Sequence, residues 1–449
     1  MKNLLVFILF TVIAGLINGC GSSHDPQKLN EFSANQLNEW HDKLTEVIIS
    51  DIFTPPVASR IYVYPHIAAY EVLRNQYTEY RTLAGQLNNF TEVPTPDTDV
   101  DIYYPLASII AFSTASKVLV FNVDMIEEYE QQYLEQIQQV GINKRIFENS
   151  VNYGREVGNH LIEYAKDDGY IARQSMPRYI LEEDPGKWVP TPPDYMPGIE
   201  PHWETMRTLV LDSAKQFVPL PPTPFDSTPG SLFYQECMEV YETVNKLDEE
   251  QLEIAKFWDC NPNISFTKGH VMFYHQQISP GGHWLSIASI VSRMEDMDFM
   301  RKSEVFTMTS IALYDAFISC WDEKYRSSLI RPETYIDRYI DPDWKPILQT
   351  PAFPEYTSGH SVISSAAAVA LTKLVGDNYA FADSSEVDYG LPVRNYNSFF
   401  HASNEAAISR LYGGIHYRPA CENGLAQGKS VGNFIMKKIE TKKSMQAMK

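Results

Sequence analysis

The chain has 449 residues, of which 44% are hydrophobic and 12% aromatic, which is enough for one large domain or two to three ordinary ones. Its 37 basic and 57 acidic residues give a formal charge of -20, which would repel nucleic acid and anionic membrane surfaces. Nucleic acid is therefore excluded as a partner, and any anion-binding site must be local.

The N-terminus has the pattern of an export signal. Lys2 precedes an apolar run that ends in "LINGC", and Cys20 closes that motif. The run is too short to span a bilayer and is typical of a secretory signal with a bacterial lipobox. We predict that residues 1–20 form a lipoprotein signal peptide with lipidation at Cys20. The protein would then be an exported bacterial lipoprotein, periplasmic or on the cell surface, held to the membrane only by its lipid. An ordinary signal peptide or a short anchor is the alternative.

Four further cysteines have no recognisable pairing pattern. Cys237, Cys260, Cys320 and Cys421 contain no CxxC motif and no Cys/His zinc spacing. Disulfides and free buried thiols both remain open, because sequence does not give the connectivity.

The pattern along the chain predicts an all-α protein made of two helical bundles. Apolar residues recur at three- and four-residue steps in residues 21–183 and again in residues 231–449. Prolines crowd residues 184–230, which predicts an ordered crossover between the bundles. Trp188 and Trp203 indicate that this crossover packs against the rest of the molecule. We expect the C-terminal bundle to hold an oxyanion site.

The segment "PEYTSGHSV" (residues 354–362) predicts the start of a helix. Thr357 or Ser358 can cap the helix, Gly359 allows the backbone to approach a ligand, and His360 lies in the first turn. Free N–H groups at a helix N-terminus bind anions. Taken alone, the motif is also that of a capped helix with an incidental histidine.

Two other motifs add cations and a second histidine. In "KYRSSLIRP", Lys324 and Arg331 lie seven apart, so they should project from one face of a helix that ends near Arg331. Two solvated charges at a helix C-terminus are the simpler alternative. In "SRLYGGIHYRP", Arg410 and His416 lie on different faces of a regular helix, but Gly413-Gly414 can break it and bring them together.

The three motifs together predict a site for a tetrahedral oxyanion, and at this point the chain resembles a known family. The signature K-x6-RP, PSGH, SR-x5-H of the vanadium-dependent haloperoxidases is similar to these segments in order and spacing. That family shares its site with type 2 phosphatidic acid phosphatases and bacterial acid phosphatases. Trp321 and Phe353 also resemble halide-pocket residues of the fungal chloroperoxidases.

The resemblance implies an enzyme that oxidises bromide or iodide, with chloride as a further candidate. Vanadate would be the cofactor, with phosphate as a competing occupant, and hydrogen peroxide, halide and a small organic acceptor would be the partners. His416 would be the vanadium ligand, and His360 and Lys324 would be the other catalytic groups. The implied vanadate-binding set is Lys324, Arg331, Ser358, Gly359, His360, Arg410 and His416.

The chain departs from the family pattern at two positions. Thr357 stands where the motif usually has proline. Ala420 stands where an acid often orients the last histidine, and we expect Glu422, Asp315 or a backbone carbonyl to replace that acid. The remaining histidines that we considered are predicted to be structural, or in the case of His283 structural or pocket-lining: His66, His160, His270, His275, His283 and His401.

Two other functions use the same residues. In an acid phosphatase, His416 would attack phosphorus and His360 would protonate the leaving group of a soluble phosphomonoester. In a surface lipoprotein without turnover, the same site would only bind an oxyanion. The halide, the acceptor and the oligomeric state are not given by the sequence.

Overall fold

The structure is a computed structural model that describes residues 25–443, apart from residues 263, 269 and 275. The predicted signal peptide and Cys20 lie outside the described residues. Among the helices of the described part, none is both long and apolar enough to cross a membrane.

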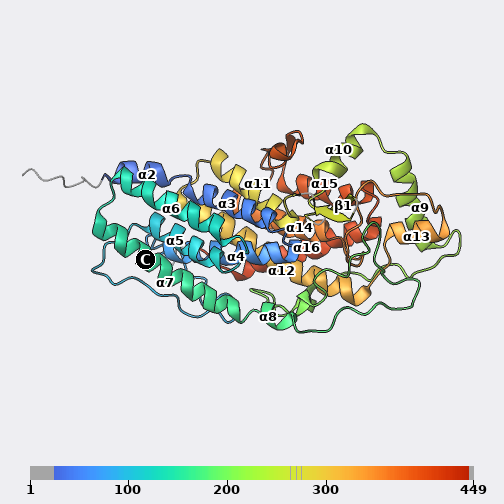
Figure 1. Ribbon diagram of the computed structural model, residues 1–449, viewed down its shortest axis with the longest axis horizontal. Helices are drawn as coiled ribbons and strands as arrows, with labels where there is room; N and C mark the ends of the chain where they lie inside the picture. Colours follow the sequence, from blue (N-terminus) through green and yellow to red (C-terminus); the bar gives the residue numbers. More distant parts are fainter. Residues whose placement is uncertain (1–24, 263, 269, 275, 444–449) are drawn as a thin grey trace, which may run out of the picture.

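The N-terminal half is a bundle of helices around one fully buried helix. All 19 residues of α4 (Pro55–Leu73) are buried, and α4 packs against α5, α7 and α12 (Figure 1). A helix buried on every side lies at the centre of a bundle, and its charged Arg60 and Glu71 are paired with Asp168 and Arg74. The other helices of this half are α2 (Pro26–Ser33), α3 (Gln36–Ser50), α5 (Tyr104–Lys117), α6 (Val123–Val140), α7 (Lys144–Lys166) and α8 (Tyr170–Arg173).

The Pro-rich crossover packs against the rest of the molecule. It contains only two short 3-10 helices, η1 (Trp203–Thr205) and η2 (Ala214–Phe217). Trp188 and Trp203 are both completely buried. The crossover therefore contributes to the core.

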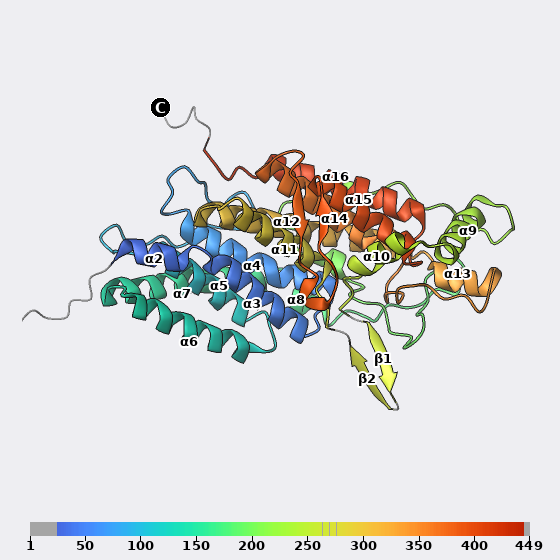
Figure 2. The ribbon, with the colours of Figure 1, turned by 90° about the horizontal axis from the view of Figure 1, so that it is seen from above.

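The C-terminal half is built around α12 and α14. Its helices are α9 (Leu232–Asn245), α10 (Glu249–Phe257), α11 (Pro280–Met294), α12 (Phe299–Ser327), α13 (Pro332–Tyr339), α14 (Gly359–Val375), α15 (Phe399–Tyr412) and α16 (Arg418–Lys438), with the 3-10 helix η3 (Val387–Tyr389). Figure 2 shows α14, α15 and α16 side by side, and the long helix α12 packs against α14 and α16.

A line of glycines brings α16 unusually close to α14. A Cβ added at Gly424, Gly428 or Gly432 would lie 3.1, 2.0 or 3.0 Å from a backbone oxygen of Ser358, Val362 or Ala366. Side chains at these positions would push the helices apart. The glycines therefore fix the N-terminal end of α14, which begins at the "TSGH" motif.

Two short antiparallel hairpins complete the fold. The first pairs β1 (Ser265–Lys268) with β2 (Val271–Tyr274), and the second pairs β3 (Phe381–Asp383) with β4 (Arg394–Tyr396). No sequence pattern predicted these hairpins, because each strand is only three or four residues long. The all-α class is otherwise confirmed.

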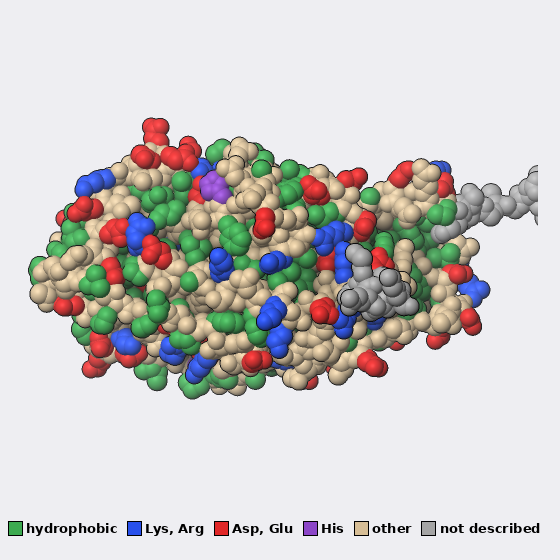
Figure 3. All heavy atoms as spheres, turned by 180° about the vertical axis from the view of Figure 1, so that it is seen from behind, with side chains coloured by type: hydrophobic (Ala, Val, Ile, Leu, Met, Phe, Trp, Pro, Cys, Tyr) green, Lys and Arg blue, Asp and Glu red, His purple; other side chains and the backbone are tan. Residues whose placement is uncertain are grey.

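One hydrophobic core continues through both halves of the molecule, and it runs in sequence from Leu29 to Ile439. A smaller cluster lies under α9 and α13 and includes Phe233, Tyr335 and Tyr417. On the face opposite to that of Figure 1, acidic and basic side chains are interspersed (Figure 3). The four cysteines outside the signal segment are free and buried.

Candidate active site

The structure brings most of the predicted site residues to one cavity at the N-terminal end of α14. Six of them line it: Trp321, Phe353, Gly359, His360, Arg410 and His416. Lys324 and Arg331 are fully buried beside it, and their cationic groups lie over the ring of Phe353, 4.9 and 5.0 Å from its centroid. Pro55, the first residue of α4, also lines the cavity, so both halves of the chain build the site.

Lys324 holds the loop that precedes α14. Its Nζ donates to the carbonyl oxygens of Pro354, Glu355 and Thr357 at 3.1, 3.1 and 2.6 Å. Burial lowers the pKa of Lys324 to about 7, and the nearby Arg331 contributes to that decrease. The ammonium therefore orders the "PEYT" segment and places a titratable charge beside the cavity.

Arg331 reaches the site by a route that differs from the sequence prediction. Helix α12 ends at Ser327, Ser328 has φ 49°, and Arg331 is the extended N-cap of α13, so the prediction that Lys324 and Arg331 share a helix face was wrong. The guanidinium is positioned by the carbonyl oxygens of Phe353 and Ile415, at 2.9 Å from Nε and 2.8 Å from Nη1. Burial lowers its pKa to about 10.

Ser358, and not Thr357, caps α14. Its hydroxyl accepts the backbone N–H of Ser361 at 3.3 Å, and its own N–H donates to the carbonyl of Ala420 at 3.1 Å. Thr357 follows a cis peptide bond and donates its hydroxyl to Gln427 Oε1 at 2.7 Å. The threonine that replaces the motif proline is thus bonded to α16.

Arg410 and His416 are brought together by the glycine break that the sequence predicted. Helix α15 ends at Tyr412, and Gly414 has φ 77°. Arg410 Nη1 donates to the carbonyl oxygen of Trp258 at 2.7 Å. His416 Nε2 lies 3.2 Å from Arg331 Nη1, which donates to it.

Glu355 replaces the acid that the family pattern often has at position 420, where this chain has alanine. Its Oε1 lies 2.8 Å from His416 Nδ1 and also accepts the backbone N–H of Tyr417 at 2.9 Å. Burial raises the pKa of Glu355 to about 7, and Arg331 opposes that rise.

The two acids predicted for this role were wrong. Asp315 accepts the backbone N–H groups of three crossover residues, 209–211, and Glu422 lies 3.8 Å from Arg418 at the surface. The available signal was the glutamate inside "PEYTSGH" itself, three residues before the helix cap.

The hydrogen bonds assign the tautomer of His416, and burial decides the charge of both site histidines. Because Glu355 accepts the proton on His416 Nδ1, Nε2 keeps its lone pair on the side of Arg331. The pKa of His416 is held well below its usual range, mainly by burial and next by the positive charge of Arg331. Burial, followed by Arg410, does the same for the pKa of His360. Both imidazoles are therefore neutral near pH 7.

An oxyanion fits this arrangement because buried nitrogens at the cavity await a partner. Within the described part of the chain, Arg331 Nη2, Arg410 Nε and His360 Nε2 are buried without a hydrogen-bond partner. A buried polar atom left unsatisfied costs about 1–3 kcal/mol, so such atoms normally bond to water or to a ligand. Two of the three belong to guanidinium groups, which match a tetrahedral anion.

The aromatic wall of the cavity is fixed by the crossover. The rings of Trp321 and Phe353 lie 5.1 Å apart, and Trp321 Nε1 donates to the carbonyl oxygen of Ile199 at 3.2 Å. The wall is neutral and rigid, which suits a small polarisable anion next to the cations.

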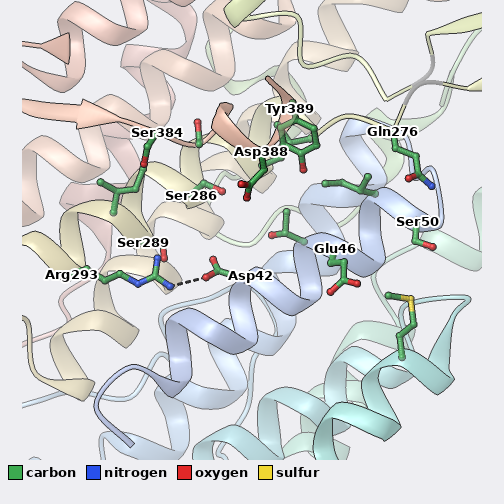
Figure 4. A pocket seen from close by; sticks show the side chains of 16 residues that line it. Asp42, Glu46, Ser50, Gln276, Ser286, Ser289, Arg293, Ser384, Asp388 and Tyr389 are labelled. Atoms are coloured by element: carbon green, nitrogen blue, oxygen red, sulfur yellow. Dashed lines mark hydrogen bonds and ion pairs between the residues drawn. The ribbon is translucent and has the colours of Figure 1, made fainter. Parts of the chain in front are cut away.

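A separate cavity of about 710 Å³ lies between α3, α11 and the segment around η3. Figure 4 shows its polar wall, including the ion pair between Asp42 and Arg293, which measures 2.6 Å. None of the predicted site residues lines it.

Comparison with known proteins agrees with this geometry. A sequence model of the VCPO second helical-bundle domain matches residues 304–444. The crystal structure of the first bacterial vanadium-dependent iodoperoxidase is 46% identical in sequence, covering 92% of this chain and 98% of that one, with a TM-score of 0.87. The chain belongs to the vanadium-dependent haloperoxidases.

More distant members of this fold also match. The holo and apo structures of a bacterial vanadium-dependent chloroperoxidase are each 15% identical, with TM-scores of 0.65 and 0.63. Each alignment covers 86% of this haloperoxidase, and the two cover 93% and 95% of the chloroperoxidase chains. At this identity the matches show the shared fold. A search of curated proteins found no match. This haloperoxidase is accordingly a peroxidase whose cofactor is vanadate.

Proposed function

We propose that this haloperoxidase oxidises iodide in preference to bromide, with hydrogen peroxide as the oxidant. The similarity to a bacterial iodoperoxidase over nearly the whole chain supports iodide. The site assignment rests on one observation: the unprotonated Nε2 of His416 lies beside the guanidinium of Arg331, which has a free N–H. Iodide is also the halide that gives up electrons most readily, so it makes the smallest demand on the oxidant.

The side chains of the cavity would hold vanadate by charge and by one ligand bond. Arg331 and Arg410 would direct their unpartnered N–H groups at its oxygens, together with the backbone N–H of Gly359 at the start of α14. His416 Nε2 would be the ligand to vanadium. Bound vanadate supplies a Lewis acid that activates hydrogen peroxide toward attack by halide.

Proton transfer would fall to His360, and Lys324 would contribute charge. His360 is neutral and has an unpartnered Nε2 in the cavity, so it can take a proton from hydrogen peroxide as the peroxide binds. Lys324, with a pKa of about 7, would add a positive charge beside the cavity at neutral and lower pH. Trp321 and Phe353 would shape the approach of halide without offering a competing charge.

The direct test is halogenation by the chain from Gly21 onward, before and after orthovanadate is added to phosphate-free protein. We expect iodination of a dimedone-type acceptor to appear only with vanadate and to exceed bromination at equal halide concentration. Equal or faster bromination would refute the iodide preference. Vanadate-inhibited hydrolysis of a phenyl phosphate without any halogenation would instead assign the phosphatase function.

Two histidine variants separate binding from turnover. His416→Ala should lose vanadium on gel filtration, because the ligand is gone. His360→Ala should retain vanadium and lose most of its turnover. Full metal content in the first variant, or unchanged rates in the second, would overturn the respective role.

We also propose that the protein is exported and anchored through Cys20. The lipobox-like sequence supports this proposal. Expressed in a bacterial host, the full chain should fractionate with membranes, and Cys20→Ser should block that attachment. Membrane association that is the same in both proteins would contradict a lipid anchor at this residue.

A further inference from the structure

A second group of metal-ligating side chains lies beside the active site. Cys260, His283 and Glu386 come from the loop after α10, the first turn of α11 and the residue before η3, and all three are buried. The thiol Sγ lies 3.2 Å from His283 Nδ1 and 3.9 Å from Glu386 Oε1. The same Nδ1 lies 3.1 Å from Glu386 Oε1. Three different ligand atoms thus surround one point.

These separations match those of a tetrahedral zinc site. With zinc bonds of about 2.3 Å to sulfur and about 2.0–2.2 Å to nitrogen and oxygen, two ligand atoms lie roughly 3.3–3.6 Å apart. Each of the three observed distances is within about half an ångström of that range. The set also suits zinc chemically, because a thiolate and an imidazole disfavour magnesium and calcium.

The other nitrogen of His283 makes the bond expected of a metal ligand. His283 Nε2 lies 2.8 Å from Asp383 Oδ2, and the other oxygen of Asp383 accepts the backbone N–H and the hydroxyl of Ser385 at 3.0 and 2.7 Å. A carboxylate that holds the Nε2 proton leaves the Nδ1 lone pair directed at Cys260 and Glu386. The ring is further fixed by stacking on Trp258, with centroids 4.4 Å apart.

We propose that Cys260, His283 and Glu386 bind one zinc ion, with the fourth position left to water. A thiolate and a carboxylate together cancel the charge of Zn²⁺, so the ion and its three ligands would carry no net charge. Without a metal, the same residues would be an imidazolium held between Asp383 and Glu386 with a neutral thiol. The experiment must distinguish the zinc site from this metal-free arrangement.

The site would support the vanadate cavity. Cys260 lines that cavity together with His360 and Arg410, and Arg410 Nη1 bonds to the carbonyl of Trp258, two residues before Cys260. Zinc would therefore fix the segment that orients Arg410. The large cavity of Figure 4 includes Ser384 and Ser385 in its wall, and because these two residues join Asp383 to Glu386, the cavity would give the ion an approach.

The test uses the mature chain without vanadate, treated with a chelator and then supplied with zinc or cobalt. Elemental analysis after gel filtration should find one zinc per chain. Cobalt should give a thiolate-to-cobalt charge-transfer band in the near ultraviolet. Cys260→Ser should lose the band, Glu386→Gln should lower zinc affinity at least about tenfold, and Cys237→Ser, a buried thiol on α9, should keep both signals.

Absence of zinc and of the cobalt band from folded wild-type protein would overturn the proposal. Loss of the band in Cys237→Ser as well, or zinc retained equally by Cys260→Ser and Glu386→Gln, would place the metal elsewhere and overturn it too. Should Cys260→Ser fail to fold, the Glu386→Gln affinity and the wild-type spectrum still decide, because neither needs the cysteine variant.

Discussion

At the residue scale, the bond between Glu355 and His416 decides which ring nitrogen faces the cavity. Glu355 Oε1 lies 2.8 Å from His416 Nδ1 and accepts its proton. Glu355→Ala removes this acceptor, so the imidazole can turn or change tautomer. We expect vanadate affinity to fall about 10- to 100-fold, as for other residues that orient a ligating histidine. Glu355→Gln should lose less, because its amide oxygen can still accept that proton. Equilibrium dialysis with vanadate measures both.

The matched control for these variants is Glu130→Ala. Glu130 is also a buried glutamate, bonded to Ser113 and Lys117 in the N-terminal bundle away from the cavity. Its loss should lower the free energy of unfolding and leave vanadate affinity unchanged. If Glu355→Ala bound vanadate as tightly as wild type, the orienting role would be wrong.

A second prediction at this scale concerns pH and Lys324. Burial lowers its pKa to about 7, so its ammonium is charged below that pH and loses its charge as the pH rises through it. Vanadate affinity should therefore weaken from about pH 6 to about pH 9 more steeply in wild type than in Lys324→Arg, whose charge persists. The ionisation of vanadate itself affects both proteins equally. Parallel affinity profiles would show that Lys324 does not titrate in this way.

At the element scale, the sequence predicted where side chains meet better than how the backbone brings them there. The helix start at Ser358 and the glycine break before His416 both follow from local rules on caps and positive φ. The approach of Arg331 depends on where α12 ends, and a helical pattern defines its own end poorly. Glu355 was missed because its contact with His416 joins loops 61 residues apart.

The glycine break supplies a prediction of its own. Gly414 has φ 77°, and a Cβ there would lie 2.9 Å from Val244 Cγ2 and 3.1 Å from Pro346 Cβ. A positive φ costs a residue with a side chain about 1–2 kcal/mol. Because the added Cβ also clashes, Gly414→Ala should lower the free energy of unfolding by more than that amount and should displace His416. Denaturant unfolding and vanadate binding would measure the two effects.

Gly85→Ala separates backbone strain from displacement of the site. Gly85 also has φ 77°, but nothing lies within 4 Å of the position that an added Cβ would occupy. This variant should lose stability through φ alone and bind vanadate normally. Equal losses of binding in both variants would mean that general destabilisation, and not the position of His416, explains the effect.

At the scale of the whole molecule, the two halves share one core. Helix α4 is buried along its entire length and packs against α12, the helix that carries Trp321 and Lys324. Pro55 of α4 and Ile199 of the crossover also reach the cavity or its aromatic wall. The C-terminal half therefore holds most of the site residues but lacks part of the structure that keeps them in place.

A chain that begins at residue 231 should for this reason fail to bind vanadate, although it keeps every cation and histidine of the site. Removing α4 exposes the apolar face of α12, and exposed apolar surface of that extent favours aggregation over a packed state. Co-expression of residues 21–230 as a separate chain should restore solubility and vanadate binding, because the covering surfaces return. A soluble C-terminal fragment with a cooperative unfolding transition and wild-type affinity would show that its bundle is an independent domain.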